Sequence, residues 1–353
     1  MHRTSRQRGA TVDTSWALWQ HFCATLGLDA LALGTCDRIT LLQLYAQRYC
    51  TGSISPGRNS VRARTVEDAV RAVGQAYARL GAPDPRLTVH GTVDFRLTSM
   101  YRAWQKEDSP PTRVKPLPLP VVAQVWALAS ADASPFAVAT AECLVLGFFF
   151  LLRPGEYLGV PRTEHGPIFR VQDVRLWIGD PALSTLDYPE PDLLAATFVT
   201  FTFTTQKNGV RNETIGHGRS GHPHLCPVLC AAARLLALRR DHAVATTPLN
   251  AVRPTPTAPL IHVLSSDATA RIRAALVLHP DPAYSASDVS ARSTRAGGAM
   301  ALLCAGIDRD RIRLVGRWRS DEMYRYLHVQ AQPVMNGLAA AMLRGGSFRL
   351  TPS

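Results

Sequence analysis

A proline-rich segment constrains the fold of this chain more than any other feature of its sequence. Residues 109–120 read Ser-Pro-Pro-Thr-Arg-Val-Lys-Pro-Leu-Pro-Leu-Pro, so that five of the twelve residues are proline. Proline fixes φ and removes a backbone donor, and such a stretch favours an extended, semi-rigid strap with little capacity to pack. The sequence therefore predicts a first domain over residues 1–108, a linker over 109–120, a second domain over 121–345 and a tail over 346–353.

The first of these domains is predicted to be helical. Apolar residues recur at helical spacing in four segments, and Asn59-Ser60 and Ala82–Pro85 break the pattern between them. The four predicted helices are Ser15–Leu26, Asp37–Tyr49, Thr65–Leu80 and Asp94–Gln105.

The second domain is predicted to combine helices with a few strands. Thr197–Thr204 alternates polar and apolar residues over most of its length, and Phe169–Gly179 also has strand character. An Asn208-Gly209 turn followed by a return strand over Val210–Ile215 predicts a hairpin, whereas Ala245–Pro259, rich in Thr and Pro, is predicted as a surface loop. The remaining predicted helices are Val121–Ala129, Pro135–Leu152, Pro227–Arg240, Asp267–Val277, Ser287–Ala305, Arg309–Val315, Asp321–His328 and Pro333–Arg344. The predicted fold class is mainly α with a small antiparallel β-sheet (α+β).

Composition excludes a disordered chain and leaves two explanations for the charge. Of the 353 residues 46% are hydrophobic, which supports a large packed core. Lys and Arg number 39 against 27 Asp and Glu, a formal net charge of +12, and only three of the 39 are lysine. This arginine excess points to a polyphosphate partner such as nucleic acid, but the codon bias of a G+C-rich genome accounts for it equally well.

Secretion and membrane insertion are not expected. Residues Met1–Ala10 are basic and polar and contain no apolar core, unlike a secretory signal. The longest apolar run, Cys143–Leu152, is about half the length that a membrane span needs. The seven cysteines, an odd number in a long chain, are expected to be scattered buried thiols of an intracellular protein.

Three segments of the second predicted domain combine arginine with small or aromatic residues. Leu151–Glu156 runs from an apolar helix into Arg-Pro-Gly-Glu, Ser290–Met300 carries two arginines three positions apart on one helical face, and Leu314–Ser320 places a tryptophan between arginines. Each segment alone is explained by a helix end or by packing. Together they indicate a positive local field, because from Arg292 to Arg325 there are eight arginines and four acidic residues, with tyrosines among them.

In this order, the segments resemble the motifs of the tyrosine recombinases of the phage-integrase superfamily, in particular the crypton-like integrases of eukaryotic mobile elements. The first arginine motif of that family is similar to Leu152–Glu156, and its second, usually His-x-x-Arg followed by small residues, is similar to Arg292–Gly298. Its hairpin lysine matches Lys207, and its Gly-His or Gly-x-Trp motif matches Gly316–Trp318. Its nucleophile matches Tyr326, eight residues after that tryptophan.

The resemblance implies a metal-independent enzyme, without a cofactor, that cleaves and rejoins DNA through a covalent 3′-phosphotyrosyl intermediate. Arg153 and Arg295 would hold the reacting phosphate, on which negative charge develops. Tyr326 would attack phosphorus, and Lys207 would give a proton to the departing oxygen. Tyr324 is a rival nucleophile on a different helical face, but the spacing from the tryptophan favours Tyr326.

Three further positions complete the implied site. Trp318 would donate its indole N–H toward the phosphate or pack the nucleophile helix, and Glu156 would orient Arg295 or its neighbours. Arg292 departs from the family pattern, which has histidine or sometimes lysine there, and arginine binds phosphate but cannot exchange a proton near neutral pH. The departure is tolerable if this position mainly supplies charge, and it lowers activity if the position acts as a general base.

The same resemblance implies the partners. Residues 121–330 would form the catalytic domain and the preceding helices a core-binding (SAM-like) domain, the two closing around double-stranded DNA as a clamp. Recombination would pair two duplexes on a homotetramer, with Pro333–Arg344 docking either on a neighbouring protomer or within its own chain. The protein would act in the nucleus if eukaryotic and otherwise in the cytoplasm or nucleoid. The alternative is a catalytically decayed or domesticated DNA-binding protein derived from a mobile-element integrase, which Arg292 favours.

A second group of residues has the donor types of a zinc site. His222, His224, Cys226 and Cys230 offer nitrogen and sulfur ligands. The first three alternate along an extended stretch, and the two cysteines lack the usual two-residue spacing. We therefore interpret Cys226-Pro227 as a helix start and predict no metal.

Overall fold

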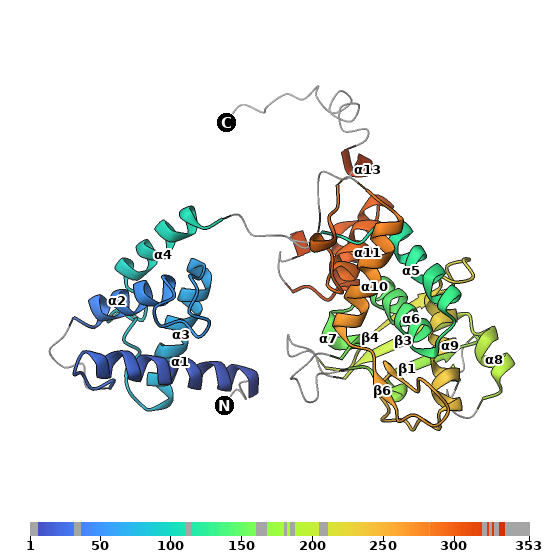
Figure 1. Ribbon diagram of the computed structural model, residues 1–353, viewed down its shortest axis with the longest axis horizontal. Coiled ribbons are helices and arrows are strands. Elements are labelled where there is room, and N and C mark those ends of the chain that lie inside the picture. The colour runs from blue at the N-terminus through green and yellow to red at the C-terminus, as the bar shows by residue number, and fades with distance from the viewer. Residues whose placement is uncertain are drawn as a thin grey trace, which may run out of the picture. The chain divides into compact units, whose positions relative to one another are not determined.

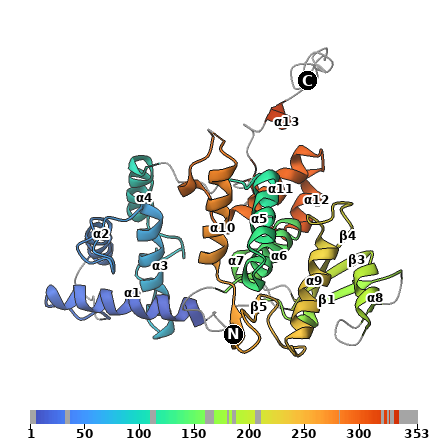
Figure 2. The ribbon, with the colours of Figure 1, turned by 45° about the vertical axis from the view of Figure 1, so that its right-hand side comes forward.

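The chain is mainly helical with a small antiparallel sheet, which confirms the predicted fold class. It divides into two compact units, Met1–Pro111 and Thr112–Ser353, which Figures 1 and 2 show in ribbon form. The structure, a computed structural model, describes residues 6–31, 37–109, 115–159, 168–179, 182–183, 188–204, 211–281, 283–319, 323–324, 327 and 332–335.

The first unit consists of helices packed around α3. Its elements are α1 (Arg6–Thr25), α2 (Arg38–Cys50), α3 (Ala63–Arg79) and α4 (Phe95–Glu107). The side chains of Asp37 and Asp94 accept hydrogen bonds from backbone N–H groups two residues on, and so begin α2 and α4. The alanine and valine face of α3 packs against the other three helices, and the aromatic rings of Trp19 and Tyr45 meet edge to face at 5.2 Å in the core.

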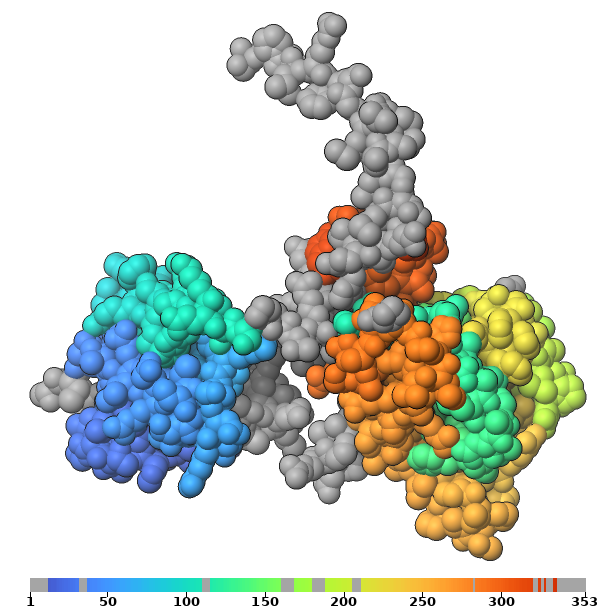
Figure 3. All heavy atoms as spheres, turned by 45° about the horizontal axis from the view of Figure 1, so that its top comes forward, coloured from blue at the N-terminus to red at the C-terminus, as the bar shows by residue number. Residues whose placement is uncertain are grey.

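The second unit is built around the apolar helix α6 (Pro135–Phe149). Ser134 caps this helix, Pro135 occupies its first turn, and nearly every residue from Ala137 to Phe148 is buried. Helices α5 (Leu119–Asp132), α9 (Pro227–Arg240), α10 (Ser265–Leu278) and α11 (Ser293–Cys304) pack against it (Figure 2). Figure 3 shows α10 alongside α5 at the surface of this unit. No helix of the described residues is both long enough and apolar enough to cross a membrane.

A four-stranded antiparallel sheet of order β2-β1-β3-β4 packs against α9. The predicted strand Thr197–Thr204 is confirmed as β3 (Phe198–Phe203), whose central residue Phe201 lies opposite both Val174 and Ile215. The return strand begins later than predicted. The Asn208-Gly209 turn lies outside the described residues. The strands and short helices of this unit are α7 (Pro154–Tyr157), η1 (Val171–Asp173), β1 (Val174–Trp177), β2 (Ala182–Leu183), α8 (Glu190–Ala195), β4 (Glu213–Gly218), β5 (Ala251–Val252), β6 (Ile261–His262), η2 (Ala286–Asp288), α12 (Arg309–Val315) and α13 (Gln332–Met335).

The second half of the proline-rich segment packs tightly, contrary to the prediction from its composition. Leu117 is 1% exposed, and its N–H donates to the carbonyl of Ser293 at the start of α11. Lys115 forms a 2.7 Å ion pair with Asp288, and the hydroxyl of Tyr284 donates to the carbonyl of Pro116. Proline lacks only its own N–H, so its carbonyl and the N–H groups of the residues between prolines can still form hydrogen bonds. An extended proline-rich segment can therefore be bonded to neighbouring elements.

Two other predictions are wrong in the second unit. The predicted helix Ser287–Ala305 is interrupted, because η2 ends at Asp288 and α11 begins only at Ser293. The predicted loop Ala245–Pro259 contains the buried strand β5, which pairs with β6. The predicted helices over 321–328 and 333–344 fall mostly outside the described residues.

Candidate functional site

The first arginine motif forms a tight turn after α6. Leu151 takes a positive φ of 49°, which reverses the chain and leaves its carbonyl facing the other motifs. Arg153 is then the N-cap of α7, and Glu156, three residues on, accepts the backbone N–H of Arg153 at 2.8 Å. The other carboxylate oxygen accepts Nη1 of the Arg153 side chain at 2.9 Å. Arg-Pro-Gly-Glu is thus a helix start that also orients its arginine.

The second arginine motif meets this turn from α11. Arg295 is 2% exposed, and its guanidinium donates to the carbonyls of Leu151 and Gly316. The Arg295 guanidinium also lies 4.3 Å from the ring centroid of Trp318, a cation–π contact. Tyr157 fixes α7 to this helix, because its hydroxyl bonds to Thr294 at 2.9 Å.

The Gly-Arg-Trp motif completes the arrangement after α12. Trp318 packs in a small apolar cluster with Leu151, Ile312 and Met323, and Leu327 lies against the same cluster. The residues that bracket the tyrosine motif are therefore held beside the arginine turn. The two roles expected of the tryptophan, donation toward a phosphate or packing of the nucleophile helix, stay predictions.

Arg317, between the glycine and the tryptophan, was not predicted as a site residue. Its φ is +57°, its side chain is fully buried, and its Nη2 donates to Glu156 at 2.9 Å and to the Leu151 carbonyl at 3.5 Å. Its guanidinium lies 3.6 Å from the ring centroid of Phe203 on β3. Burial lowers the pKa of Arg317 to about 10, while the carboxylate of Glu156 opposes that shift. The sequence signal for Arg317 is its place between Gly316 and Trp318, the glycine and the tryptophan of the third motif.

The predicted site residues are thus brought together in part. Arg295 donates to the Leu151 carbonyl, Trp318 packs in the same apolar cluster as Leu151, and Arg153 and Glu156 bond to each other in the turn that follows. Glu156 bonds to Arg153 and to Arg317. The sequence alone did not show which of the arginines of the three motifs Glu156 would bond to.

The other predicted positions are placed differently or not at all. Arg292 precedes α11 and is exposed while Arg295 is buried, so the prediction that the two share a helical face is wrong. Tyr324 is 46% exposed, with the Arg309 guanidinium 5.6 Å from its ring centroid. Lys207 and Tyr326 lie outside the described residues.

The arrangement can hold an anion. Arg153 and Arg317 share one carboxylate, which leaves positive charge in excess, and one residue in each of the two segments, Leu151 and Arg317, is held in the left-handed region. The Arg153 side chain is 32% exposed, and its Nε and Nη2 have no hydrogen-bond partner within the described part of the chain. A bidentate contact from a guanidinium suits a phosphate oxygen pair.

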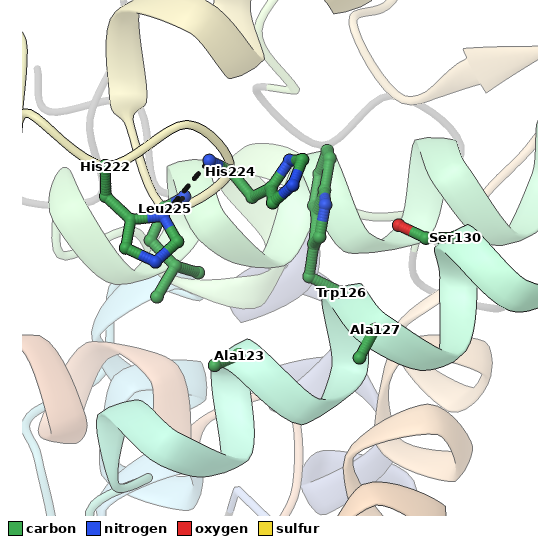
Figure 4. A pocket seen from close by; sticks show the side chains of 7 residues that line it. All are labelled: Ala123, Trp126, Ala127, Ser130, His222, His224 and Leu225. Atoms are coloured by element: carbon green, nitrogen blue, oxygen red, sulfur yellow. Dashed lines mark hydrogen bonds between the residues drawn. The ribbon is translucent and has the colours of Figure 1, made fainter.

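The histidine and cysteine group does not form a ligand cluster. His222 uses Nδ1 to accept the backbone N–H groups of His224 and Leu225, and His224 stacks on Trp126 at 5.4 Å (Figure 4). These side chains line a pocket of about 380 Å³ against α5. Among the described residues, no group of three or more His, Cys, Asp and Glu is placed to hold a metal ion.

Comparison with known proteins gives a distant likeness to solved structures. No protein-family model matches the chain, and no curated protein matches its sequence. Among solved structures the chain is similar to "Crystal structure of XerA recombinase", with 14% sequence identity and a TM-score of 0.38, over 99% of this chain and 94% of that chain. The contacts of Arg153, Arg295 and Arg317 near Leu151 therefore carry the evidence for function.

Proposed function

We propose that the protein is a DNA strand-transfer enzyme that cuts and rejoins duplex DNA through a covalent 3′-phosphotyrosyl intermediate. The observation that carries this proposal is the convergence of arginines from three separate segments on one turn, with the described residues Met323 and Leu327 in the apolar cluster of Leu151 and Trp318. Arg153 and Arg295 come from segments more than a hundred residues apart, and both are oriented by groups at that turn. Leu327, next to Tyr326 in the chain, packs on the same apolar cluster as Trp318.

In the proposed reaction Tyr326 gives its phenolic proton to water and attacks phosphorus, and the bond from phosphorus to the 5′ oxygen breaks. Arg153 and Arg295 neutralise the charge that develops on the non-bridging oxygens. Lys207 gives a proton to the departing 5′ oxygen, and the reverse steps rejoin the strand. No metal ion takes part in these steps. Integration of a mobile element by a homotetramer on two duplexes belongs to the same proposal.

The alternative is a DNA-binding protein that has lost catalysis. Arg292 favours this alternative, because an exposed arginine stands where the resembled family has histidine or lysine. Such a protein would bind duplex DNA but form no covalent product.

A nicked suicide duplex separates the two. Since the target sequence is unknown, duplexes are made from the DNA flanking the gene and from a randomised library, and covalent protein–DNA product is measured by denaturing gel in EDTA. We expect a product that is abolished in Tyr326→Phe and retained in Tyr324→Phe, because only one phenol attacks. Tight duplex binding without any covalent product in the native protein would instead establish the non-catalytic alternative.

A further inference from the structure

Arg317 is a buried cation that contacts several fixed partners. Its side chain is fully buried, and it contacts three segments: Glu156 of α7, the carbonyl of Leu151 and the ring of Phe203 on β3. Its Nε and Nη1 are buried without a hydrogen-bond partner in the described residues. Burying a charge in this way is costly unless the charge serves the site.

Glu156 divides its two oxygens between the neighbouring groups. Oε2 accepts the Arg153 backbone N–H at 2.8 Å and the Arg317 Nη2 at 2.9 Å. Within the described part of the chain, Oε1 accepts only Nη1 of Arg153, at 2.9 Å. Arg153 therefore gives one guanidinium nitrogen to Glu156 and keeps Nε and Nη2 for another partner.

Removal of the Arg317 guanidinium would change this division. Oε2 would lose the one side-chain donor that it has among the described residues. A carboxylate next to an arginine favours a bidentate contact, in which two guanidinium nitrogens donate to the two carboxylate oxygens. Arg153 would then turn both nitrogens of its fork toward Glu156 and away from a bound phosphate.

We propose that Arg317 is a positioning residue, which acts through Glu156 to keep the Arg153 guanidinium open to a phosphate. It does not touch the phosphate itself, because its side chain has no exposed surface. This inference rests on the proposed function for its consequence in catalysis, but the orientation of Arg153 can be measured without it.

The first experiment measures covalent product formation at saturating nicked duplex. Arg317→Met should slow it roughly 100-fold, as expected for a misplaced phosphate ligand, with the duplex dissociation constant unchanged. Arg317→Lys, which keeps the charge, should recover part of the rate. Arg319→Met, which changes an exposed arginine two residues on, is the matched control and should retain the native rate.

A double-mutant cycle tests whether Arg317 acts through Glu156. In a Glu156→Gln background, Arg317→Met should cause little further loss in the rate of covalent product formation, because Glu156 no longer links Arg317 to Arg153. If the two losses multiply in full, or if Arg317→Met changes only the dissociation constant, the positioning role is wrong.

The second experiment needs no activity. Phenylglyoxal labelling of the free protein, read by peptide mass spectrometry, should modify Arg153 in the native protein and several-fold less in Arg317→Met. Arg317→Gln replaces that variant if a thermal melt shows that it does not fold. Unchanged labelling of Arg153 overturns the inference. If Arg153 labelling is reduced in Arg317→Met but the native protein forms no covalent product, the inference is supported and the proposed function is rejected.

Discussion

At the scale of single residues, two ion pairs among the described residues have both side chains buried, and only Glu156–Arg317 is at the candidate site. Glu142 on α6 and Arg234 on α9 form a 3.2 Å ion pair with side chains 4% and 2% exposed. Arg234 also donates to the carbonyl of Ala251 on β5. This second pair lies in the core of the unit, where its role is to join helices. Burial raises the pKa of Glu142 to about 7, although Arg234 opposes the shift.

The Glu142 carboxyl should make stability depend on pH. Its pKa is raised from 4.5 to about 7 on folding, so the native state binds more protons than the unfolded chain between these values. The free energy of unfolding therefore falls as pH rises from 5 to 8, by an amount on the order of 2 kcal/mol. Glu142→Gln should remove this decrease, as measured by urea unfolding at the two pH values.

Glu190→Gln is the control for this experiment. Glu190 also pairs with an arginine, Arg240, but both side chains are well exposed. Its pH dependence should match that of the native protein. A native pH dependence in Glu142→Gln would mean that another group is responsible.

At the scale of elements, α11 is held between the strap and α6. A Cβ on Gly297 would collide with the backbone of Leu117, and a Cβ on Gly298 would collide with the carbonyl of Phe148. The small residues after Arg295 thus allow close approach on two sides. The proline-rich segment is bonded to the start of this helix, because the N–H of Leu117 donates to the carbonyl of Ser293, two residues before Arg295.

Gly297→Ala should loosen this contact. The added methyl group meets backbone, which cannot move aside as a flexible side chain can, so we expect a loss of about 2 kcal/mol in urea unfolding. Gly218→Ala is the matched control, because a Cβ there comes no closer than 3.9 Å to a neighbouring atom. Equal stabilities of the two variants would show that the strap adapts to the methyl group.

At the scale of the whole molecule, the charge excess can now be tested against its two explanations. The formal net charge of +12 is carried almost entirely by arginine. Several of these arginines are buried or paired with carboxylates, among them Arg234, Arg295 and Arg317. Codon bias accounts for the number of arginines, but it does not place them at a buried turn.

Salt dependence distinguishes a phosphate-binding surface from codon bias. If six or more phosphates are contacted, duplex affinity should fall by about 10³ or more between 50 and 200 mM salt. Fluorescence anisotropy of the full chain with a labelled duplex measures this, with an unlabelled acidic protein as the competitor control. Weak binding that does not respond to salt would leave codon bias as the explanation.

The sequence by itself determined the elements that depend on short-range interactions. Helices such as Pro227–Arg240 and Arg309–Val315 and the core of the strand Thr197–Thr204 follow from periodicity and capping. The Arg153 to Glu156 turn is also local, but its pattern was interpreted as a helix end, and the start of α7 at this position was not predicted. Only the tertiary structure decided that Leu117 is buried, because its partner Ser293 is far along the chain. The same is true of Arg317, whose exposed or buried state depends on Glu156 and Phe203, residues more than a hundred positions away.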